Sequence, residues 1–341
     1  MAPETIRHIL IIRLSSLGDI VLTTPILQLL RGSCPEARID FLLKAEYQDL
    51  LRAHPCVDRL LLWEKQQSLR AMLRTLRKTR YDVVLDLHRT LRSWLLYRGV
   101  RARRRLAYSK RTLRRELLVR LRWNTLRTMT TVPERYAAPL RRLGITASLP
   151  PTALYLDVEC QDAMARHLMQ ALSECPERPL FAVAPGARWP TKRWPVERFA
   201  QAAQTLAARY EATIILVGDR TETSLARELT ARLSVPVMDW TGRLSLMQTA
   251  VLIQRCQLLL CNDSGLMHVA VALQVPVVAI FGPTVQEFGF YPFQARAQVL
   301  SRPLACRPCS TKGSLYCPRG HHDCMTHITT EQVVEAAEAL W

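Results

Sequence analysis

Long apolar runs are missing from this sequence of 341 residues. No segment reaches the roughly 18 consecutive apolar residues that suggest a transmembrane helix. The stretch from Met1 to Ile12 also lacks the charged-then-apolar order of a signal peptide, because the apolar run that starts at Ile9 ends at Arg13. We therefore expect a cytoplasmic protein, and its ten cysteines should be reduced unless they bind metal.

Several familiar ligand motifs are missing as well. The sequence contains neither a Walker phosphate loop nor the glycine pattern of dinucleotide-binding proteins, and it has no Asp-x-Asp metal motif. Aromatic residues make up only 7% of the chain, and no zinc-finger or RNA-recognition signature is present. A nucleic-acid-binding protein is therefore the weaker alternative function, and we expect no nucleic acid partner.

Negative charge is scarce in the first half of the chain. Residues 1–150 contain 30 Lys and Arg against 12 Asp and Glu, whereas residues 151–341 contain 17 of each. This asymmetry predicts that the first half meets something anionic, such as a nucleic acid, a phosphorylated lipid surface or an acidic glycan. A generally Arg-rich proteome would not explain the neutral second half.

Basic residues are densest between positions 89 and 127, which hold 14 Lys and Arg and the single acid Glu116. Leu113, Leu117 and Leu121 recur there at helical spacing. A basic amphipathic helix of this kind is typical of an anionic membrane surface. Alternatively, the leucines pack against the protein and the arginines face water. Both interpretations remain open at this point.

Short apolar runs alternate with helical patterns along the whole chain. In the first half the apolar runs lie at 8–12, 38–43 and 81–86, and in the second half at 180–184, 213–217, 235–238, 258–261 and 277–280. This rhythm predicts an α/β fold with two doubly wound, Rossmann-like domains that face a cleft. One helix is expected from Ile20 to Leu30, with Pro25 inside it.

The pattern loosens in the middle of the chain, where proline-rich ends enclose a helix expected at 161–172. We take residues 159–178 as an interdomain connection. The expected organisation is then an N-terminal domain at 1–158, this connection, a C-terminal domain at 179–325 and a final helix at 326–341.

Three polar loops follow strands in the second half. Asn262-Asp263-Ser264-Gly265 ends one strand and opens a helix, whose first N–H groups suit a phosphate. The loop at 184–195 brings cations, and the loop at 217–222 ends the next strand. Because the carboxyl ends of parallel strands meet at one edge of a sheet, these loops predict a nucleotide site. For Asp263 and Ser264, simple helix capping is the alternative interpretation.

A similar polar turn, Ser15-Ser16-Leu17-Gly18-Asp19, follows the first strand. A carboxylate at this position would face the expected cleft and could act as a general base. On spacing alone, Asp19 is more simply a helix cap.

Four strings in the chain resemble glycosyltransferase family 9, the ADP-heptose:lipopolysaccharide heptosyltransferases. They are LIIRLSSLGDIVLTTPIL at 10–27, the weaker DLHRTLRS at 86–93, APGARWPTKRWP at 184–195 and NDSGLMHVAVALQVPVVAIFGPT at 262–284. The second half is more similar to heptosyltransferase II, and the first turn also to heptosyltransferase I. The resemblance implies a GT-B fold with the acceptor on the N-terminal domain and the donor on the C-terminal one. It also implies inversion at the anomeric carbon and no cofactor required for catalysis.

The resemblance also implies roles for single residues. Asp19 matches the family's catalytic base, and Lys192 matches the lysine that stabilises the departing diphosphate. The donor-binding residues it implies, with the acid open between two positions, are Thr191, Lys192, Asp219 or Glu222, Asp263, Ser264, Gly265, Leu266 and His268. For the acceptor and its phosphates we expect Ser15, Ser16, Gly18, His88, Arg89 and Arg92.

The implied partners are ADP-heptose, a Kdo- or heptosyl-lipid A core acceptor and the anionic inner face of the inner membrane, where the protein would be peripheral. Another nucleotide sugar is the alternative donor within the same fold.

Four cysteines cluster near the C-terminus with His321 and His322 between them: Cys306, Cys309, Cys317 and Cys324. Four thiolates can hold zinc or iron tetrahedrally. The sequence therefore suggests a structural Zn or Fe ion outside the expected cleft. Reduced cysteines that pack a loop-rich tail are the alternative.

Overall fold

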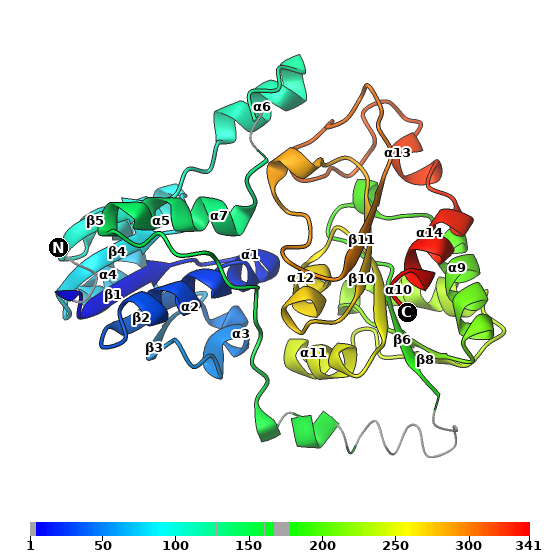
Figure 1. Cartoon of the computed structure of the whole chain (residues 1–341), viewed down its shortest axis with the longest axis horizontal. Helices are drawn as coiled ribbons and strands as arrows, with labels where there is room; N and C mark the ends of the chain where they lie inside the picture. The colour runs from blue at the N-terminus through cyan, green and yellow to red at the C-terminus, as the bar shows by residue number, and fades with distance from the viewer. Residues whose placement is uncertain (1–4, 127–128, 160, 165, 167–177) are drawn as a thin grey trace. The chain divides into compact units, whose positions relative to one another are not determined.

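The computed structural model describes residues 5–126, 129–159, 161–164, 166 and 178–341. The chain separates into two compact units (Figure 1). Unit 1 consists of Met1–Arg111 and Thr130–Tyr155, and unit 2 consists of Thr112–Met129 and Leu156–Trp341. The expected connection at 159–178 and its helix fall largely outside the described ranges.

Unit 1 contains a parallel five-stranded sheet in the order β3-β2-β1-β4-β5. The strands are β1 (His8–Ile12), β2 (Arg38–Lys44), β3 (Arg59–Trp63), β4 (Tyr81–Asp86) and β5 (Ala102–Ala107). The helices are α1 (Leu17–Val21), α2 (Thr24–Ser33), α3 (Asp49–Arg52), α4 (Leu69–Leu76), α5 (Leu91–Gly99) and α7 (Val132–Ala137), with 3-10 turns η2 (Ala45–Tyr47) and η3 (Ala138–Leu143).

The core of unit 1 follows from its continuous apolar strands. Leu10 and Ile12 of β1 are fully buried in a cluster with Met72 of α4 and Leu96 of α5. Ile11, which points to the opposite face of the sheet, is also fully buried. A strand covered on both faces reads as an unbroken apolar run, which is why β1 could be predicted from the sequence.

The prediction of one continuous helix through Pro25 is wrong, because the structure has two helices there. α1 ends at Val21, and α2 begins at Thr24 with Pro25 in its first turn. Proline is tolerated at this position because the first helical N–H groups have no partner within the helix.

Unit 2 contains a parallel six-stranded sheet in the order β11-β10-β9-β6-β7-β8. The strands are β6 (Leu180–Ala184), β7 (Thr213–Leu216), β8 (Val237–Asp239), β9 (Leu258–Asn262), β10 (Val277–Phe281) and β11 (Ala297–Ser301). The helices are α6 (Thr112–Leu121), α9 (Val196–Arg209), α10 (Thr223–Thr230), α11 (Leu246–Gln254), α12 (Gly265–Ala272), α13 (Asp323–Thr326) and α14 (Thr330–Glu338), with 3-10 turns η4 (Pro190–Lys192), η5 (Arg220–Glu222) and η6 (Gln286–Phe288).

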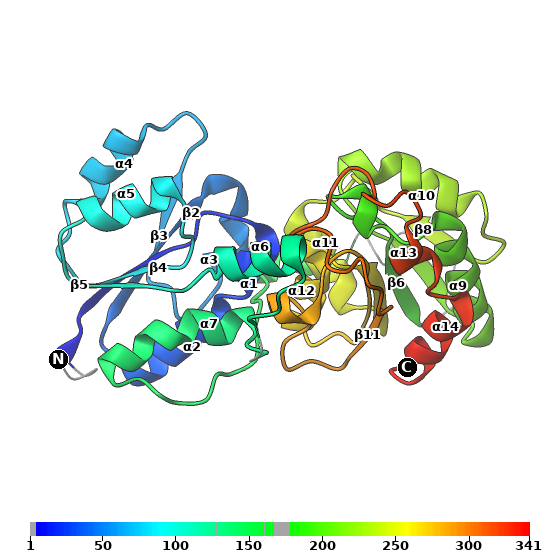
Figure 2. The ribbon, with the colours of Figure 1, turned by 90° about the horizontal axis from the view of Figure 1, so that it is seen from above.

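Helices cover both faces of the second sheet. One buried cluster joins the sheet to α9, α10 and α14, and a second joins its other face to α11 and α12 (Figure 2). The five strands expected in this half are present, and β11 is an additional edge strand. The doubly wound α/β architecture predicted from the alternating pattern is therefore confirmed. No helix in the described ranges is both long and apolar enough to cross a bilayer.

The basic segment with α6 packs within unit 2. Leu118 and Leu126 are buried against Phe288, and the Arg115 guanidinium lies 4.6 Å from the centre of the same ring. Leu113 is exposed instead, as is Leu121 at the other end of α6. The interpretation that these leucines pack against the protein is therefore wrong for Leu113 and Leu121, because a different face of α6 is buried.

Truncation of the fully buried Leu260 in β9 should destabilise unit 2. Leu260→Ala is expected to lower the free energy of unfolding by about 2–5 kcal/mol, because the sheet on either side cannot collapse into the space that is left. Urea denaturation followed by tryptophan fluorescence would measure it. Leu315→Ala, at an exposed leucine of the same unit, should stay within about 0.5 kcal/mol of the unchanged protein. Equal losses in both variants would contradict the buried position of Leu260.

Candidate functional site

The strand order of each sheet reverses beside its first strand. In unit 2 the reversal lies between β6 and β9, and in unit 1 between β1 and β4. Ligands of open α/β sheets bind at such points, next to the carboxyl ends of the strands. The loops that follow these four strands carry most of the residues that the sequence singles out.

In unit 2 the side chain of Asn262 fixes the loop after β6 to the end of β9. Its Nδ2 donates a hydrogen bond to the carbonyl of Pro185 at 2.8 Å, and its Oδ1 accepts one from the N–H of Trp194 at 3.0 Å. Asn262 is fully buried. A buried amide with both ends bonded holds two loops in one arrangement.

Lys192 and Asp263 form a largely buried ion pair at this edge. The Lys192 Nζ lies 2.5 Å from Asp263 Oδ2, and Thr284 Oγ1 donates to the same oxygen at 2.8 Å. These residues come from the loops after β6, β9 and β10. The structure thus brings together the expected Lys192 and Asp263 and adds Thr284, which lies at the end of the fourth quoted string but was not singled out.

The N-terminus of α12 lies directly after Asp263. Ser264 is the N-cap residue, yet its hydroxyl makes no capping hydrogen bond. Among the described side chains, Ser264 Oγ is buried without a hydrogen-bond partner. A helix N-terminus with such a hydroxyl suits the oxygen of an anionic ligand. Leu266 is partly buried against the core beneath this turn, and His268 is buried one turn into the helix.

Glu222 and Asp219, the two acids left open, have different surroundings. A Cβ atom on Gly186 or Gly218 would overlap the Glu222 carboxylate, which therefore lies against bare backbone at the ends of β6 and β7. Burial raises the pKa of Glu222. Asp219 instead caps η5, because its Oδ1 accepts hydrogen bonds from the N–H and the hydroxyl of Thr221.

The expected donor residue Thr191 is occupied by structural contacts. Its hydroxyl donates to the carbonyl of Ser314 at 2.8 Å and accepts from the Ser314 N–H at 2.9 Å. Nε2 of His322 lies 2.9 Å from the Thr191 carbonyl. Thr191 therefore anchors the loop that carries Lys192, and the cysteine-containing loop supplies its partners.

In unit 1, Asp19 is held by several groups at the end of β1. Its Oδ2 lies 2.6 Å from the Arg13 guanidinium and 2.8 Å from Ser16 Oγ, and the Tyr136 hydroxyl lies 3.5 Å from Oδ1. Arg13 is buried and also donates to the carbonyl of Leu87. Ser16 is the N-cap of α1 and Asp19 its capping-box partner, so the capping interpretation also describes the structure.

Asp86 organises the neighbouring loop after β4. This fully buried carboxylate accepts hydrogen bonds from the N–H groups of His88 and Arg89 at 2.9 and 3.0 Å, and from Ser93 Oγ at 3.1 Å. The sequence placed Asp86 only at a strand end. Burial next to a turn makes it the residue that shapes the expected acceptor loop, and Arg92 is exposed in the α5 turn that follows.

His88 connects the two loops of unit 1. Its ring lies next to the backbone of Ser15 in the loop after β1, and Gly18 is buried in the following helix α1. Burial, followed by the positive charges of Arg13 and Lys110, lowers the pKa of His88 to about 4. The ring is therefore neutral at pH 7 and adds no positive charge to this loop.

The structure does not support the expected zinc or iron site. Cys306 Sγ lies 4.0 Å from Nε2 of His321, but across the described ranges no group of three or more His, Cys, Asp or Glu could hold a metal ion. Burial, with the nearby Cys309 thiol, raises the pKa of Cys324 to about 12.

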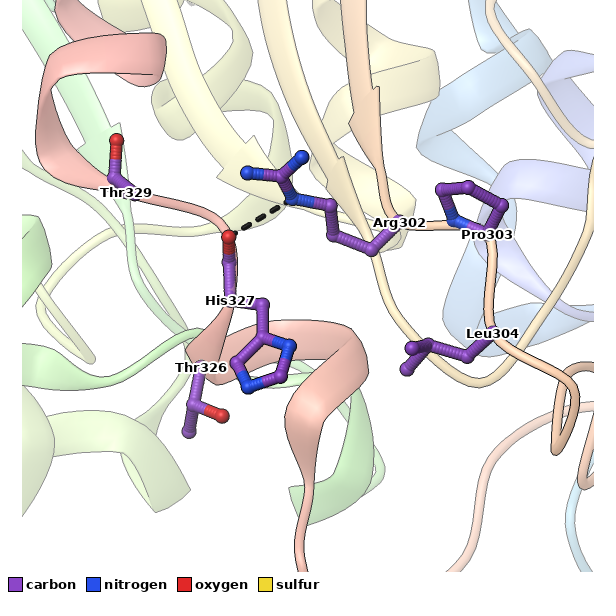
Figure 3. A pocket seen from close by; sticks show the side chains of 6 residues that line it. All are labelled: Arg302, Pro303, Leu304, Thr326, His327 and Thr329. Atoms are coloured by element: carbon purple, nitrogen blue, oxygen red, sulfur yellow. Dashed lines mark hydrogen bonds between the residues drawn. The ribbon is translucent and has the colours of Figure 1, made fainter.

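An open depression of about 500 Å³ lies elsewhere in unit 2 (Figure 3). It is lined by Arg302, Pro303, Leu304, Thr326, His327 and Thr329. Arg302 Nε donates a hydrogen bond to the His327 carbonyl at 2.9 Å along one side. None of the expected donor or acceptor residues lines it, so we assign it no part in the site.

Comparison with known proteins gives a consistent result. The family model described as glycosyltransferase family 9 (heptosyltransferase) matches residues 69–318. Lipopolysaccharide heptosyltransferase 2 of Escherichia coli strain K12 is 28% identical over 97% of this chain and 98% of its own length.

Two solved structures share the fold over their whole length. The ADP-heptose lipopolysaccharide heptosyltransferase II of E. coli superposes with a TM-score of 0.77 and 26% identity, covering 98% of each chain. A family 9 glycosyl transferase from Veillonella parvula DSM 2008 gives a TM-score of 0.82 at 24% identity, covering 100% of this chain and 98% of its own.

The lowered pKa of His88 should appear as a loss of stability in acid. As pH falls from 6.5 towards 4, the unfolded chain binds a proton that the folded ring does not, so folding weakens by about 1 kcal/mol per pH unit. His88→Gln should remove this contribution when urea unfolding is measured at both ends of the range. His327→Gln, at an exposed ring, is the control, and it should lose as much stability between pH 6.5 and 4 as the unchanged protein. An unchanged loss in His88→Gln would mean that this ring titrates normally.

Proposed function

We propose that this chain, which belongs to glycosyltransferase family 9, transfers heptose from ADP-heptose to the inner core of lipopolysaccharide. The full-length similarity to lipopolysaccharide heptosyltransferase 2 supports this substrate class. The observation that carries the proposal is the anion site at the switch point of unit 2. There the Lys192–Asp263 pair lies beside the N-terminus of α12 and the Ser264 hydroxyl, which has no hydrogen-bond partner among the described residues.

Unit 2 holds the donor in this proposal. Lys192 moves from Asp263 to the diphosphate, which also accepts hydrogen bonds from Ser264 Oγ and the first N–H groups of α12 at Gly265. Asp263 is then available for a sugar hydroxyl. Glu222 binds donor hydroxyls in preference to Asp219, because its carboxylate lies where two glycines leave the backbone bare.

Unit 1 binds the acceptor and supplies the base. Asp19 takes the proton of the acceptor hydroxyl while that oxygen forms a bond to the anomeric carbon. The bond from this carbon to the β-phosphate oxygen breaks, and ADP leaves with the electron pair. A single displacement of this kind inverts the anomeric configuration, and a positioned base contributes on the order of 10²–10⁴ in rate.

Two further features complete the reaction. Lys192 and the α12 N-terminus stabilise the negative charge that develops on ADP, a role that a metal ion fills in other enzymes. Arg13 fixes the orientation of Asp19, while Arg89 and Arg92 contact acceptor phosphates.

The basic first half of the chain attracts the protein to the anionic inner face of the membrane, where each basic residue near the surface contributes about 1 kcal/mol to binding.

Loss of Asp19 should abolish transfer without loss of the donor. Asp19→Ala and the isosteric Asp19→Asn are each expected to lower turnover by about 10²–10⁴ because the proton acceptor is gone. The assay is transfer from ADP-heptose to defined truncated core acceptors, with ADP-sugar binding measured by calorimetry. Asp49→Asn, at an exposed carboxylate of the same unit, should transfer normally. Near-normal turnover by Asp19→Asn would remove Asp19 from its role, and no transfer by the unchanged protein to any acceptor would refute the proposed function.

Loss of Lys192 should weaken nucleotide binding. Lys192→Ala removes the cation that meets the diphosphate, and we expect ADP affinity to fall about tenfold or more, corresponding to one charge-assisted hydrogen bond. Calorimetry with ADP and, separately, UDP checks the affinity and the choice of nucleotide. Lys312→Ala, at an exposed lysine of the same unit, should bind ADP normally. Unchanged ADP affinity in Lys192→Ala would contradict the assignment, and preference for UDP would favour another nucleotide sugar.

A further inference from the structure

Helix α5 in unit 1 exposes three large apolar side chains in a row. Leu91 is 73% exposed, Trp94 44% and Leu95 38%. Their spacing puts them on one face of the helix, and Arg98 continues the same face one turn later. Isolated exposed leucines are ordinary, but a tryptophan between two leucines on one short helix is a patch.

The orientation of this face is fixed from beneath. The opposite side of α5 places Ser93 and Leu96 at zero exposure, and Leu96 belongs to the sheet core. Ser93 also donates to the buried Asp86, and the Thr90 hydroxyl caps the helix. The helix cannot rotate to bury its outer face without breaking these contacts, so Trp94 is held outward.

The charged residues of α5 and of the neighbouring helix α4 are all basic. Helix α4 lies beside α5 (Figure 2). The side chain of Leu73 in α4 lies against Gly99 at the end of α5. Neither helix contains an acidic residue. The exposed basic residues on or next to them are Arg70, Arg74, Arg77, Lys78, Arg89, Arg92 and Arg98.

We propose that the α4–α5 face docks on an anionic bilayer, with Leu91, Trp94 and Leu95 entering the headgroup region and the surrounding arginines contacting lipid phosphates. Apolar side chains ringed by basic ones are the pattern that binds at this interface, where tryptophan is favoured. A nucleic acid would meet the arginines but would leave both leucines in water, because aliphatic side chains do not stack on bases as aromatic ones do.

The inference rests on the proposed function in one respect, the amphiphilic nature of the acceptor. Arg89 and Arg92, assigned above to acceptor phosphates, lie at the start of the same helix. The acceptor's polar core would therefore meet the loop after β4 while its acyl chains stay in the bilayer under α5. This arrangement brings the enzyme to a substrate that does not leave the membrane.

Vesicle binding tests the docking face without any turnover. The full chain is mixed with vesicles of phosphatidylcholine alone, or of equal parts phosphatidylcholine and phosphatidylglycerol. We expect binding only to the anionic vesicles, weakened by added salt. Brominated lipid should quench tryptophan emission, and Trp94→Phe should remove most of this quenching, because the other six tryptophans stay in the protein or in water.

The decisive variant is Leu91→Glu, with Val158→Glu as its matched control. A glutamate in the first turn of α5 is compatible with the helix, so the variant should fold. It should bind anionic vesicles at least about tenfold more weakly, because it loses an apolar contact and adds repulsion. Val158 is 68% exposed and lies outside the basic region, so Val158→Glu should bind normally.

Each alternative outcome contradicts the inference. Normal vesicle binding by Leu91→Glu, or undiminished quenching in Trp94→Phe, would mean that another surface meets the membrane. Duplex DNA binding that falls in parallel in Leu91→Glu would make nucleic acid the occupant. Transfer to a deacylated acceptor should be unchanged in Leu91→Glu, so failure of the docking face is distinguishable from failure of the proposed function.

Discussion

In each sheet, the strand that comes first in the chain pairs in parallel with the strand that comes fourth: β1 with β4, and β6 with β9. This pairing determines where a ligand can bind in each unit. Because β6 pairs with β9, Ala184 lies opposite Cys261, and the chain on either side must turn away in opposite directions. The backbone groups of the diverging loops find no strand partner there. In unit 2 the side-chain amide of Asn262 donates a hydrogen bond to one of these groups, the carbonyl of Pro185. In unit 1 the buried carboxylate of Asp86 accepts one from the N–H of His88 after β4.

A charged pair at such a point has a cost that a ligand can offset. Lys192 and Asp263 are both largely withdrawn from water, and a buried pair of this kind gains little net stability over an apolar one. In the proposed function, this burial keeps the lysine largely dehydrated before the diphosphate binds. The Arg13–Asp19 pair in unit 1 has the same character, with the cation more deeply buried than the anion.

The sequence predicted those elements whose local pattern agrees with their final environment. The strands buried on both faces, such as β4 and β9, were found to within a residue. By contrast, β5 was missed because its three consecutive arginines do not resemble a strand, and their stems are only partly covered at the sheet edge.

The site could be predicted to the level of loops but not of contacts. Lys192 and Asp263 were singled out, yet only the fold shows that they touch each other and that Thr191 is used up by Ser314. The proposed preference for Glu222 over Asp219 rests on the contact of its carboxylate with two glycines, which the β6–β7 pairing brings together. No spacing along the chain encodes that.

The insertion of Thr112–Met129 into unit 2 has a practical consequence for anyone who dissects the protein. The chain passes from one unit to the other at three places, next to Arg111, Met129 and Tyr155. A fragment that ends at Tyr155 would carry α6 without Phe288, and would expose Leu118 and Leu126 to solvent. A fragment that begins at Leu156 would lack the segment that covers this aromatic ring. Neither half is therefore a self-contained unit for expression. A cut made in the linker alone would leave buried apolar side chains exposed on both fragments.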